Sequence, residues 1–243
     1  MSRIRRAFHP DLAAGAGAVV RLSADESHHV RRVLRLRRGD LVSLFDGRGA
    51  EWSGRLAQCD ASVVGVELRF RLEDTVESPL SVRIFQGLCR PDRLEWVIQK
   101  GTELGVAAIY PLECERGERP PQGPPRADRW RRIALEACKQ SGRRVLPDVS
   151  PAETLPAAED RCALLLDPGP DAVPLRTALP AGSPAGVDLA VGPEGGFTDA
   201  ERDLACGNGW IPVSLGPRVL RTETAGLVAA AIVLHCLGDL GAV

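Results

Sequence analysis

Two glycine-marked stretches decide the fold of this chain: Val191-Gly192-Pro193-Glu194-Gly195-Gly196-Phe197 and Leu215-Gly216-Pro217-Arg218-Val219-Leu220-Arg221. Each follows a short apolar run that is typical of a buried strand, and each leads into a predicted helix. Glycine lets backbone N–H groups approach a ligand closely, because it has no Cβ and tolerates positive φ. Two such loops on neighbouring strands, at the carboxyl edge of an α/β sheet, form the usual crevice for a nucleotide-like ligand. We therefore expect the binding site around Gly192 and Gly216.

Strands and helices alternate from Ser81 to the C-terminus. Apolar runs predict strands over residues 82–88, 106–112, 162–167, 187–191 and 210–215. Asp92 with Glu95 is expected to cap the first helix, which Gly105 ends. Repeated βα units predict a mostly parallel sheet covered on both faces. The proline- and glycine-rich loop 113–125 is too long for a simple connection and is typical of a lid or binding loop.

Residues 1–72 follow a different pattern, with short strands, close turns and one helix. Ser23 and Glu26 form a capping-box pattern that predicts a helix as far as Arg35. Several short strands at close spacing predict a small β-barrel. A polar segment ending in proline follows and is the expected linker. We therefore predict two domains, residues 1–72 and residues 73–243.

Positive charge is concentrated in the first third of the chain. The whole chain carries 31 Lys and Arg against 32 Asp and Glu, a net charge of −1. Residues 1–72 hold 13 arginines against 8 acidic residues, a balance of +5, so the remaining residues carry −6. A local basic surface favours contact with a polyanion such as RNA. A solvated face, rich in arginine through codon usage, is the alternative.

The composition excludes several classes of protein. Seven scattered cysteines without C-x-x-C spacing argue against a disulfide framework or a zinc site. The adjacent His28 and His29 do not share a helix face, so no metal is expected there. No signal-peptide pattern follows the basic N-terminus, and the longest apolar stretch, residues 225–237, is too short to span a bilayer. These features favour a cytoplasmic protein without a membrane partner.

Four blocks of sequence, in this order, identify a family when they are taken together. They are Glu95-Trp96-Val97-Ile98-Gln99-Lys100-Gly101-Thr102-Glu103-Leu104-Gly105, Glu136-Ala137-Cys138-Lys139-Gln140-Ser141-Gly142-Arg143, Gly192-Pro193-Glu194-Gly195-Gly196-Phe197 and Leu215-Gly216-Pro217-Arg218-Val219-Leu220-Arg221-Thr222-Glu223-Thr224-Ala225. With them, the chain resembles the ribosomal RNA small subunit methyltransferase E family over nearly its whole length. The segment from His28-His29 to Gly39-Asp40 is similar to that family's N-terminal signature.

The resemblance implies an α/β protein with an N-terminal PUA-like β-barrel that contacts RNA. It implies that a knotted, SPOUT-type, mostly parallel α/β domain follows, with a trefoil knot in its C-terminal part. It also implies a homodimer that transfers a methyl group from S-adenosylmethionine (SAM) to N3 of a uridine in 16S rRNA of the small ribosomal subunit. The apolar last helix is then expected to contact the partner subunit.

The resemblance also assigns site residues. Those expected to surround SAM are Leu165, Leu166, Val191, Gly192, Gly195, Leu215, Gly216, Leu220, Thr222 and Ala225. Those expected to contact RNA are Arg3, Arg5, Arg6, His28, Arg31, Arg32, Arg35 and Arg116.

The chemistry of the target atom suggests the catalytic residues. Uridine N3 carries a proton, so a nearby base, or cations that stabilise the uracil anion, would lower the barrier to methylation. We expect Arg218 or Arg221 to support the anion, and Glu194 or Glu223 to position a group or take the proton. Glu223 has an alternative role at the N-terminus of the last helix, paired with Arg221.

Other functions stay open at this point. A different SPOUT RNA methyltransferase with another target nucleotide is the closest, and a non-catalytic RNA-binding protein is a second. A conventional dinucleotide enzyme is disfavoured, because Gly87-Leu88-Cys89-Arg90-Pro91 follows the first strand of the α/β domain where G-x-G-x-x-G would be needed.

Overall fold

The computed structural model describes residues 5–60, 63–73, 76–118, 125–182 and 184–241, without the side chains of 125 and 126. The chain forms two compact units. Unit 1 contains the chain up to Glu77 together with Cys138–Leu146, and unit 2 contains Ser78–Ala137 and the chain from Pro147 onward. The short segment Cys138–Leu146 was not part of the N-terminal domain expected from the sequence.

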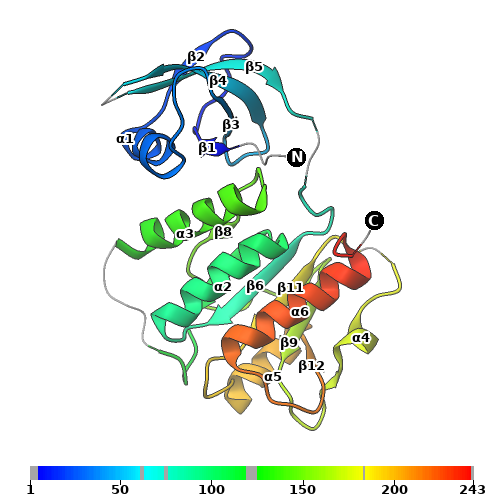
Figure 1. Ribbon diagram of the computed structural model, residues 1–243. Coiled ribbons are helices and arrows are strands. Elements are labelled where there is room, and N and C mark those ends of the chain that lie inside the picture. The colour runs from blue at the N-terminus through cyan, green and yellow to red at the C-terminus, as the bar shows by residue number, and fades with distance from the viewer. Residues whose placement is uncertain (1–4, 61–62, 74–75, 119–124, 183, 242–243) are drawn as a thin grey trace. The chain divides into compact units, whose positions relative to one another are not determined.

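Unit 1 is built on a curved sheet of five strands (Figure 1). Its strands, in spatial order, are β1 (Arg6–Phe8), β3 (Leu41–Phe45), β4 (Glu51–Cys59), β5 (Val64–Arg71) and β2 (Val19–Arg21). All neighbours pair antiparallel except β1 with β3. The expected PUA-like barrel is confirmed as a half-barrel, in which β1 and β2 form the two edges. Its core is aliphatic and includes Val30, Val42, Leu44, Val66 and Leu68.

The helix of unit 1 begins as expected but ends differently. Helix α1 (Ala24–His28) is capped by Ser23, whose Oγ accepts a hydrogen bond from the Glu26 backbone N–H at 3.2 Å. The chain then widens into a π-helical turn, His29–Val33, before a left-handed residue, Arg35, at φ 56°. The buried Glu26 side chain does not return to Ser23. It accepts a hydrogen bond from the Phe8 N–H at 3.0 Å, so it fastens α1 to the sheet.

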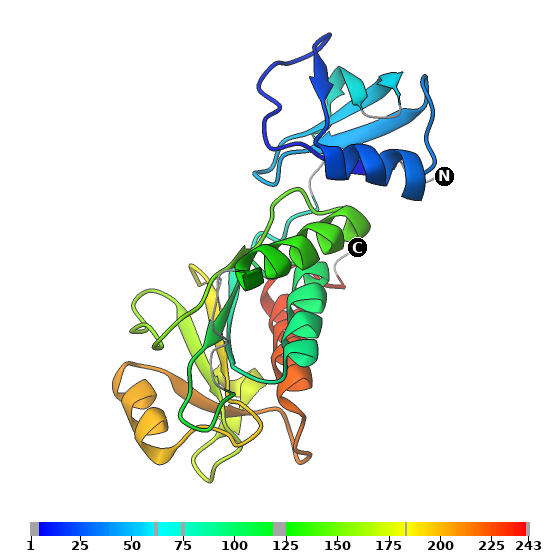
Figure 2. The ribbon, with the colours of Figure 1, turned by 90° about the vertical axis from the view of Figure 1, so that its left-hand side faces the viewer.

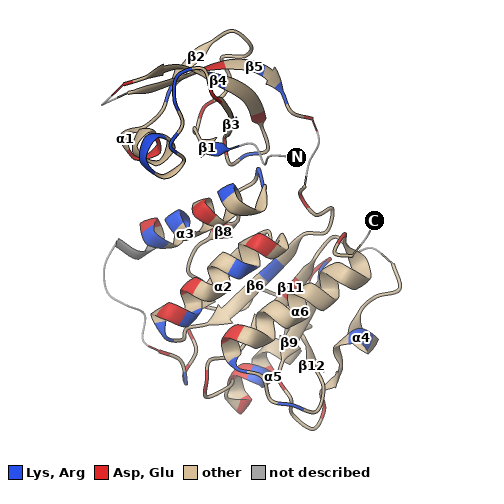
Figure 3. Cartoon of the chain, viewed as in Figure 1, with Lys and Arg blue, Asp and Glu red and all other residues tan. Residues whose placement is uncertain are grey.

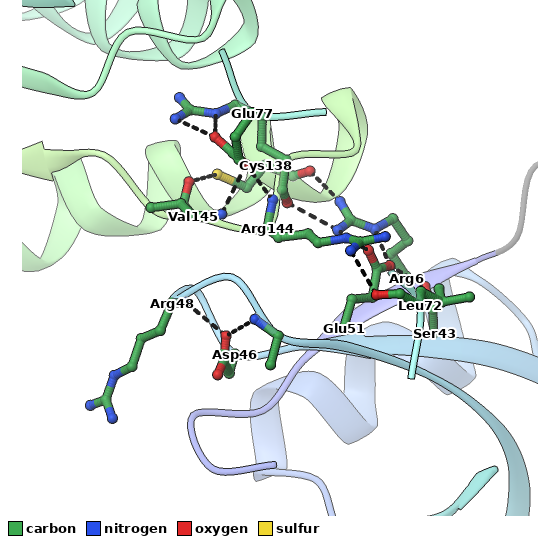
Figure 4. A network of polar contacts seen from close by, with 12 residues as sticks. Arg6, Ser43, Asp46, Arg48, Glu51, Leu72, Glu77, Cys138, Arg144 and Val145 are labelled. Carbon is green, nitrogen blue, oxygen red and sulfur yellow. Dashed lines mark hydrogen bonds and ion pairs between the residues drawn. The ribbon is translucent and has the colours of Figure 1, made fainter. Parts of the chain in front are cut away.

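A buried group of charges joins Cys138–Leu146 to the half-barrel (Figure 4). The Glu51 carboxylate receives the Arg6 Nε and the Arg144 Nε, each at 2.8 Å, and the Ser43 hydroxyl at 2.7 Å. The Arg6 guanidinium also donates to the carbonyl oxygens of Cys138 and Arg143, at 2.6 and 2.9 Å. Each of the three charged side chains is at most 9% exposed. Buried charges are tolerated only when they are paired in this way.

Two further carboxylates hold the same segment. Lys139 pairs with the buried Glu26, and the Glu77 carboxylate accepts the Arg144 N–H at 2.7 Å and the Arg143 Nε at 2.9 Å. Residues 138–146 are therefore an integral part of unit 1, although they lie about 60 residues beyond Glu77 in the sequence.

Unit 2 contains a parallel sheet of seven strands (Figures 1 and 2). Its strands, in spatial order, are β10 (Val173–Pro174), β12 (Ile211–Ser214), β9 (Cys162–Leu166), β11 (Val187–Val191), β6 (Val82–Gly87), β7 (Ala108–Leu112) and β8 (Asp148–Val149). Every pair is parallel, which confirms the predicted sheet type. The two glycine loops do not follow neighbouring strands, because β9 lies between β11 and β12.

Helices cover the two faces of this sheet. Helices α2 (Pro91–Leu104) and α6 (Thr222–Leu237) lie side by side on one face, and α5 (Asp199–Gly207) packs on the other through Ala205, next to Trp210 of the segment that follows it (Figure 2). The remaining helices are α3 (Pro125–Ser141) and the short α4 (Leu175–Ala178). Within the described residues, no helix is long and apolar enough to cross a membrane.

The helix ends differ partly from the prediction. Gly105 ends α2 in the left-handed conformation, at φ 98°, as expected. The start of α2 was placed wrongly, because Arg90 is the N-cap residue and Pro91 the first helical one, so Asp92 and Glu95 do not form a cap. This shift places Arg93 in the first turn of the helix.

Candidate functional site

A pocket of about 480 Å³ lies at the carboxyl ends of β9, β11 and β12. This volume is within the usual range for sites that bind small organic ligands. Loops after all three strands and the first turn of α6 form its wall. The lining residues are Arg93, Leu166, Asp167, Pro168, Val191, Gly192, Pro193, Glu194, Gly196, Phe197, Val213, Ser214, Leu215, Gly216, Arg218, Val219, Leu220, Arg221, Thr222 and Ala225.

The β12 loop is shaped by its glycine. Gly216 has φ 118°, a conformation that side chains with a Cβ rarely adopt. The Ser214 hydroxyl closes this turn, since it accepts the Gly216 N–H and donates to the Gly216 carbonyl oxygen, both at 3.2 Å. The backbone of residues 215–216 is thereby held at the pocket.

The β11 loop is tied to the last helix. The buried Thr222 hydroxyl donates to the Gly192 carbonyl oxygen at 2.5 Å and accepts a hydrogen bond from the Gln86 Nε2 at 2.7 Å. Gln86 is fully buried at the end of β6. Three separate segments, β6, the β11 loop and α6, thus meet through one hydroxyl group beneath the pocket.

The pocket carries charges of both signs. Arg93 donates from Nη1 to Glu194 Oε1 at 2.7 Å, and its Nε lies 3.8 Å from Glu223 Oε1. At the end of β9, the Asp167 carboxylate lies 3.0 Å from the Nε of Arg202. A ligand that itself carries both charges fits such a lining, because each charged group can find a partner.

The thiol nearest to this charged cluster is chemically quiet. Burial raises the pKa of Cys89 to about 12, and the negative charges of Glu194 and Glu223 add to the effect. A cysteine with such a pKa stays protonated near neutral pH, so Cys89 is a poor nucleophile.

Most residues predicted to bind the cofactor line the pocket. Those that do are Leu166, Val191, Gly192, Leu215, Gly216, Leu220, Thr222 and Ala225. Leu165 does not, because alternation along β9 turns it to the face covered by α5, where it is fully buried. Gly195 does not either, because it packs against Arg116. A Cβ at Gly195 would lie 3.0 Å from the Arg116 Cβ.

The predicted catalytic residues divide in the same way. Glu194, Arg218 and Arg221 line the pocket, and the two arginines are exposed. Glu223 does not line the pocket, and it forms an ion pair with Arg93 instead of Arg221. The residue at the N-cap of α6 is Arg221, and no side chain caps this helix, so Glu223 contributes only its charge to the first turn.

The sequence did not single out Arg93 or Asp167. Asp167 directly follows the β9 strand, so its position at a strand end was a usable signal. Arg93 had no such signal, because it lies 101 residues before Glu194 in the sequence and the start of its helix was predicted at the wrong residue.

The eight expected RNA contacts fall into four groups, the last of which is Arg116. Arg5, His28, Arg32 and Arg35 are exposed on unit 1, and Arg31 is partly exposed. Arg6 is buried by its bonds to Glu51 and two carbonyl oxygens, so the structure does not present it to a ligand. Arg3 lies outside the described residues.

Arg116 belongs to unit 2, where its side chain is exposed and already has partners. Its Nη1 donates to the carbonyl oxygens of Gly195 and Phe197, both at 3.3 Å. It therefore supports the glycine loop after β11 in addition to any RNA contact.

Unit 1 has a small basic pocket that the prediction covered only in part. Arg31, Arg32, Arg37 and Arg38 surround about 270 Å³ of space, together with Leu36 and Cys59. Figure 3 shows this basic segment directly after α1. Among the residues that the structure describes, no acidic side chain lines this pocket, so the arrangement favours an anionic group. In the described part of the chain, no three His, Cys, Asp or Glu side chains are grouped to hold a metal ion.

Comparison with known proteins now gives the family. A family model described as an RNA methyltransferase domain matches residues 76–234, and one described as an RNA methyltransferase PUA domain matches residues 22–60. A ribosomal RNA small subunit methyltransferase E from Synechocystis is 36% identical over 88% of this chain and 72% of its own length. The chain belongs to the ribosomal RNA small subunit methyltransferase E family.

Solved structures agree with this membership. A ribosomal RNA small subunit methyltransferase E from Neisseria gonorrhoeae, bound to S-adenosyl methionine, is 32% identical, with a TM-score of 0.89 over 98% of this chain and 99% of its own. A Legionella pneumophila protein, described as a methyltransferase in complex with the cofactor SAM, is 35% identical with the same TM-score over 98% of this chain and 100% of its own. These two solved structures therefore confirm the fold class that was predicted from the sequence.

Proposed function

We propose that this protein transfers the methyl group of SAM to N3 of a uridine in 16S rRNA. The observation that carries the proposal is the mixed-charge pocket at the ends of β9, β11 and β12, in a chain that belongs to the ribosomal RNA small subunit methyltransferase E family. Relatives of the same fold hold SAM in their crystals. The choice of uridine N3 rests on the family resemblance.

The residues of the pocket fit SAM. Its apolar wall, which includes Val191, Val213 and Leu220, suits an adenine ring, and the glycine loops leave backbone N–H and C=O groups within reach of polar edges. Asp167 offers negative charge to the cationic end and the sulfonium, and the exposed arginines of the pocket offer positive charge to the carboxylate end. When bound, SAM supplies an electrophilic methyl group.

The chain's own residues have to align uridine N3 with the methyl group and accept the proton that N3 carries. Methyl transfer needs the acceptor nitrogen in line with the bond that breaks, so fixed loops contribute most by positioning. In this proposal the exposed Arg218 and Arg221, which line the pocket, support the uracil anion, and Glu194, which also lines it, receives the N3 proton. Glu223 does not line the pocket, so we assign it a supporting role through Arg93.

Unit 1 supplies the contact with rRNA in this proposal. Its exposed arginines and the pocket lined by Arg31, Arg32, Arg37 and Arg38 offer positive charge to phosphate groups. We retain residues 1–72 as the RNA-binding domain, with 138–146 added to it, and the rest of 73–243 as the knotted catalytic domain. The homodimer and the trefoil knot also belong to the proposal.

Two measurements test the function. Calorimetric titration of the purified protein with SAM should give saturable one-to-one binding, and absence of binding would leave a non-catalytic RNA-binding protein as the alternative. Mass mapping of small-subunit rRNA, from cells with and without the gene, should then reveal one methylated uridine that depends on the gene. Methylation at another nucleotide would support a different SPOUT specificity.

A further inference from the structure

We propose that Arg93 positions the glycine loop 192–197 over the donor pocket, by holding Glu194 with one edge of its guanidinium while Glu223 fixes the other edge. The inference rests on the proposed function and names a residue that neither the sequence motifs nor the comparisons assign.

Arg93 occupies an unfavourable local position. It is the third residue of α2, where the unpaired N–H groups of the helix carry partial positive charge. A cation in this turn is disfavoured unless carboxylates surround it. Two carboxylates do so, Glu194 from the β11 loop and Glu223 from the first turn of α6. A cation at this position is locally unfavourable, and carboxylates from two distant segments offset that cost. A position of this kind is a good candidate for a functional role.

The geometry allows Arg93 to serve both carboxylates at once. Its Nη1 lies 2.7 Å from Glu194 Oε1 and its Nε 3.8 Å from Glu223 Oε1. The Glu223 side chain is 15% exposed and the Glu194 side chain 41% exposed. The carboxylate on α6 is therefore the more buried partner of Arg93, and the carboxylate on the loop is the more accessible one. A guanidinium can present several N–H groups in a rigid plane, whereas a lysine ammonium is a single point charge.

Glu223 depends on Arg93 for its charge balance. Its Oε2 is buried and has no hydrogen-bond partner among the residues that the structure describes. The nearby Cys89 is a neutral thiol, since burial raises its pKa to about 12. The charge of Glu223 therefore holds Arg93 in place more strongly than an exposed carboxylate would, because both groups are partly shielded from water.

The loop that Arg93 holds has few other polar fastenings. In the described structure, Thr222 binds the carbonyl oxygen of Gly192 at its start, and Arg116 binds the carbonyl oxygens of Gly195 and Phe197 at its end. Between these points the Gly196 N–H donates to the Pro193 carbonyl oxygen at 2.9 Å and closes a turn, while Gly195 and Gly196 themselves give the backbone little intrinsic stiffness. The contact from Arg93 to Glu194 is the ionic fastening of its middle. Both residues also line the pocket, so their separation changes the wall that faces the donor.

The test compares SAM binding by Arg93→Ala, Arg93→Lys, Glu194→Gln and the double variant Arg93→Ala/Glu194→Gln. Arg90→Ala is the matched control, because Arg90 is a 62% exposed arginine at the same helix end, forms an ion pair with the exposed Asp92 and is absent from the described lining of the pocket. We expect the dissociation constant for SAM to rise about tenfold in Arg93→Ala and in Glu194→Gln, and about threefold in Arg93→Lys. The double variant should be no weaker than Arg93→Ala, and Arg90→Ala should match the wild type.

A second readout needs no ligand. Hydrogen exchange of the backbone amides of residues 194–197 should be faster in Arg93→Ala than in the wild type, while the amides within β6 exchange unchanged. Wild-type affinity in Arg93→Ala, effects that multiply in the double variant, or unchanged exchange in the loop would each overturn the proposal. Failure of the wild type to bind SAM would instead overturn the proposed function, and the exchange experiment would still decide whether Arg93 holds the loop.

Discussion

The Thr222 hydroxyl donates a hydrogen bond of 2.5 Å to the carbonyl oxygen of Gly192, and this bond joins the last helix to the loop after β11. The same hydroxyl accepts from the Gln86 Nε2 at 2.7 Å. Because both partners are buried or lie in the wall of the pocket, one small side chain links the stability of the domain to the shape of its binding site.

Replacing Thr222 with valine keeps the volume and removes the hydroxyl. We expect unfolding to become easier by about 1–3 kcal/mol, because the buried Gln86 amide and the Gly192 carbonyl both lose a partner. SAM affinity should fall as the loop moves. Urea unfolding and calorimetry measure the two effects, and Thr222→Ser, which retains the hydroxyl, is the control. Equal stability of the valine and serine variants would contradict this role.

Gly87 allows β6 to approach the β11 loop. A Cβ at this position would lie 2.6 Å from the Pro193 backbone nitrogen and 2.9 Å from the Gly192 carbonyl carbon. Backbone atoms cannot yield as a flexible side chain does, so Gly87→Ala should displace residues 192–193 and weaken SAM binding at least tenfold. The control is Gly182→Ala, where a Cβ would meet nothing within 4 Å. If Gly87→Ala binds SAM as the control does, the close approach is not needed.

The position of the site was predictable because its signals are local. A short apolar run followed by glycines marks a strand end, and eight of the ten residues expected around the cofactor line the pocket. The spatial order of the strands in the sheet was not predictable. Nothing in the residues 187–191 or 211–215 says that β9 lies between them, since strand order is set by the packing of the whole sheet.

Arg6 shows a second limit of sequence reasoning. In a basic N-terminal run, an arginine that faces RNA and one that neutralises a buried carboxylate have the same local pattern. Arg6 is distinguished only by partners that lie 45 and more than 130 residues away, Glu51 and the carbonyl oxygens of Cys138 and Arg143. The prediction that Leu165 lines the pocket was wrong for a related reason. In a fully apolar strand the sequence does not show which face of the sheet a given residue is on, because both faces are covered.

The two kinds of arginine in unit 1 should respond differently to mutation. Arg32→Ala removes an exposed charge at the basic pocket, so rRNA affinity should fall and the slope of log affinity against log salt should decrease by about 1, with stability unchanged. Arg6→Ala should instead lower the free energy of unfolding by about 3 kcal/mol, because Glu51 stays buried with one cation fewer. Filter binding at several salt concentrations and thermal unfolding separate them. A stable Arg6→Ala variant with reduced RNA affinity would restore Arg6 as an RNA contact.

Glu51 makes unit 1 sensitive to acid. Burial alone would raise the pKa of Glu51, but hydrogen bonds and charge from Arg6, with hydrogen bonds from Ser43 and Arg144, outweigh it and leave the pKa below its ordinary value of 4.5. A carboxyl whose pKa is lower in the folded state stabilises the protein above the unfolded-state pKa, and this contribution is lost as the pH falls through the folded-state pKa. Glu51→Gln should therefore be about 3 kcal/mol less stable than the wild type near neutral pH, and the difference should shrink as the pH falls below 4.5. Denaturant unfolding across this range measures the difference, with the exposed Glu67→Gln as control. A gap between wild type and Glu51→Gln that stays constant with pH would mean that the network does not act through the ionised carboxylate.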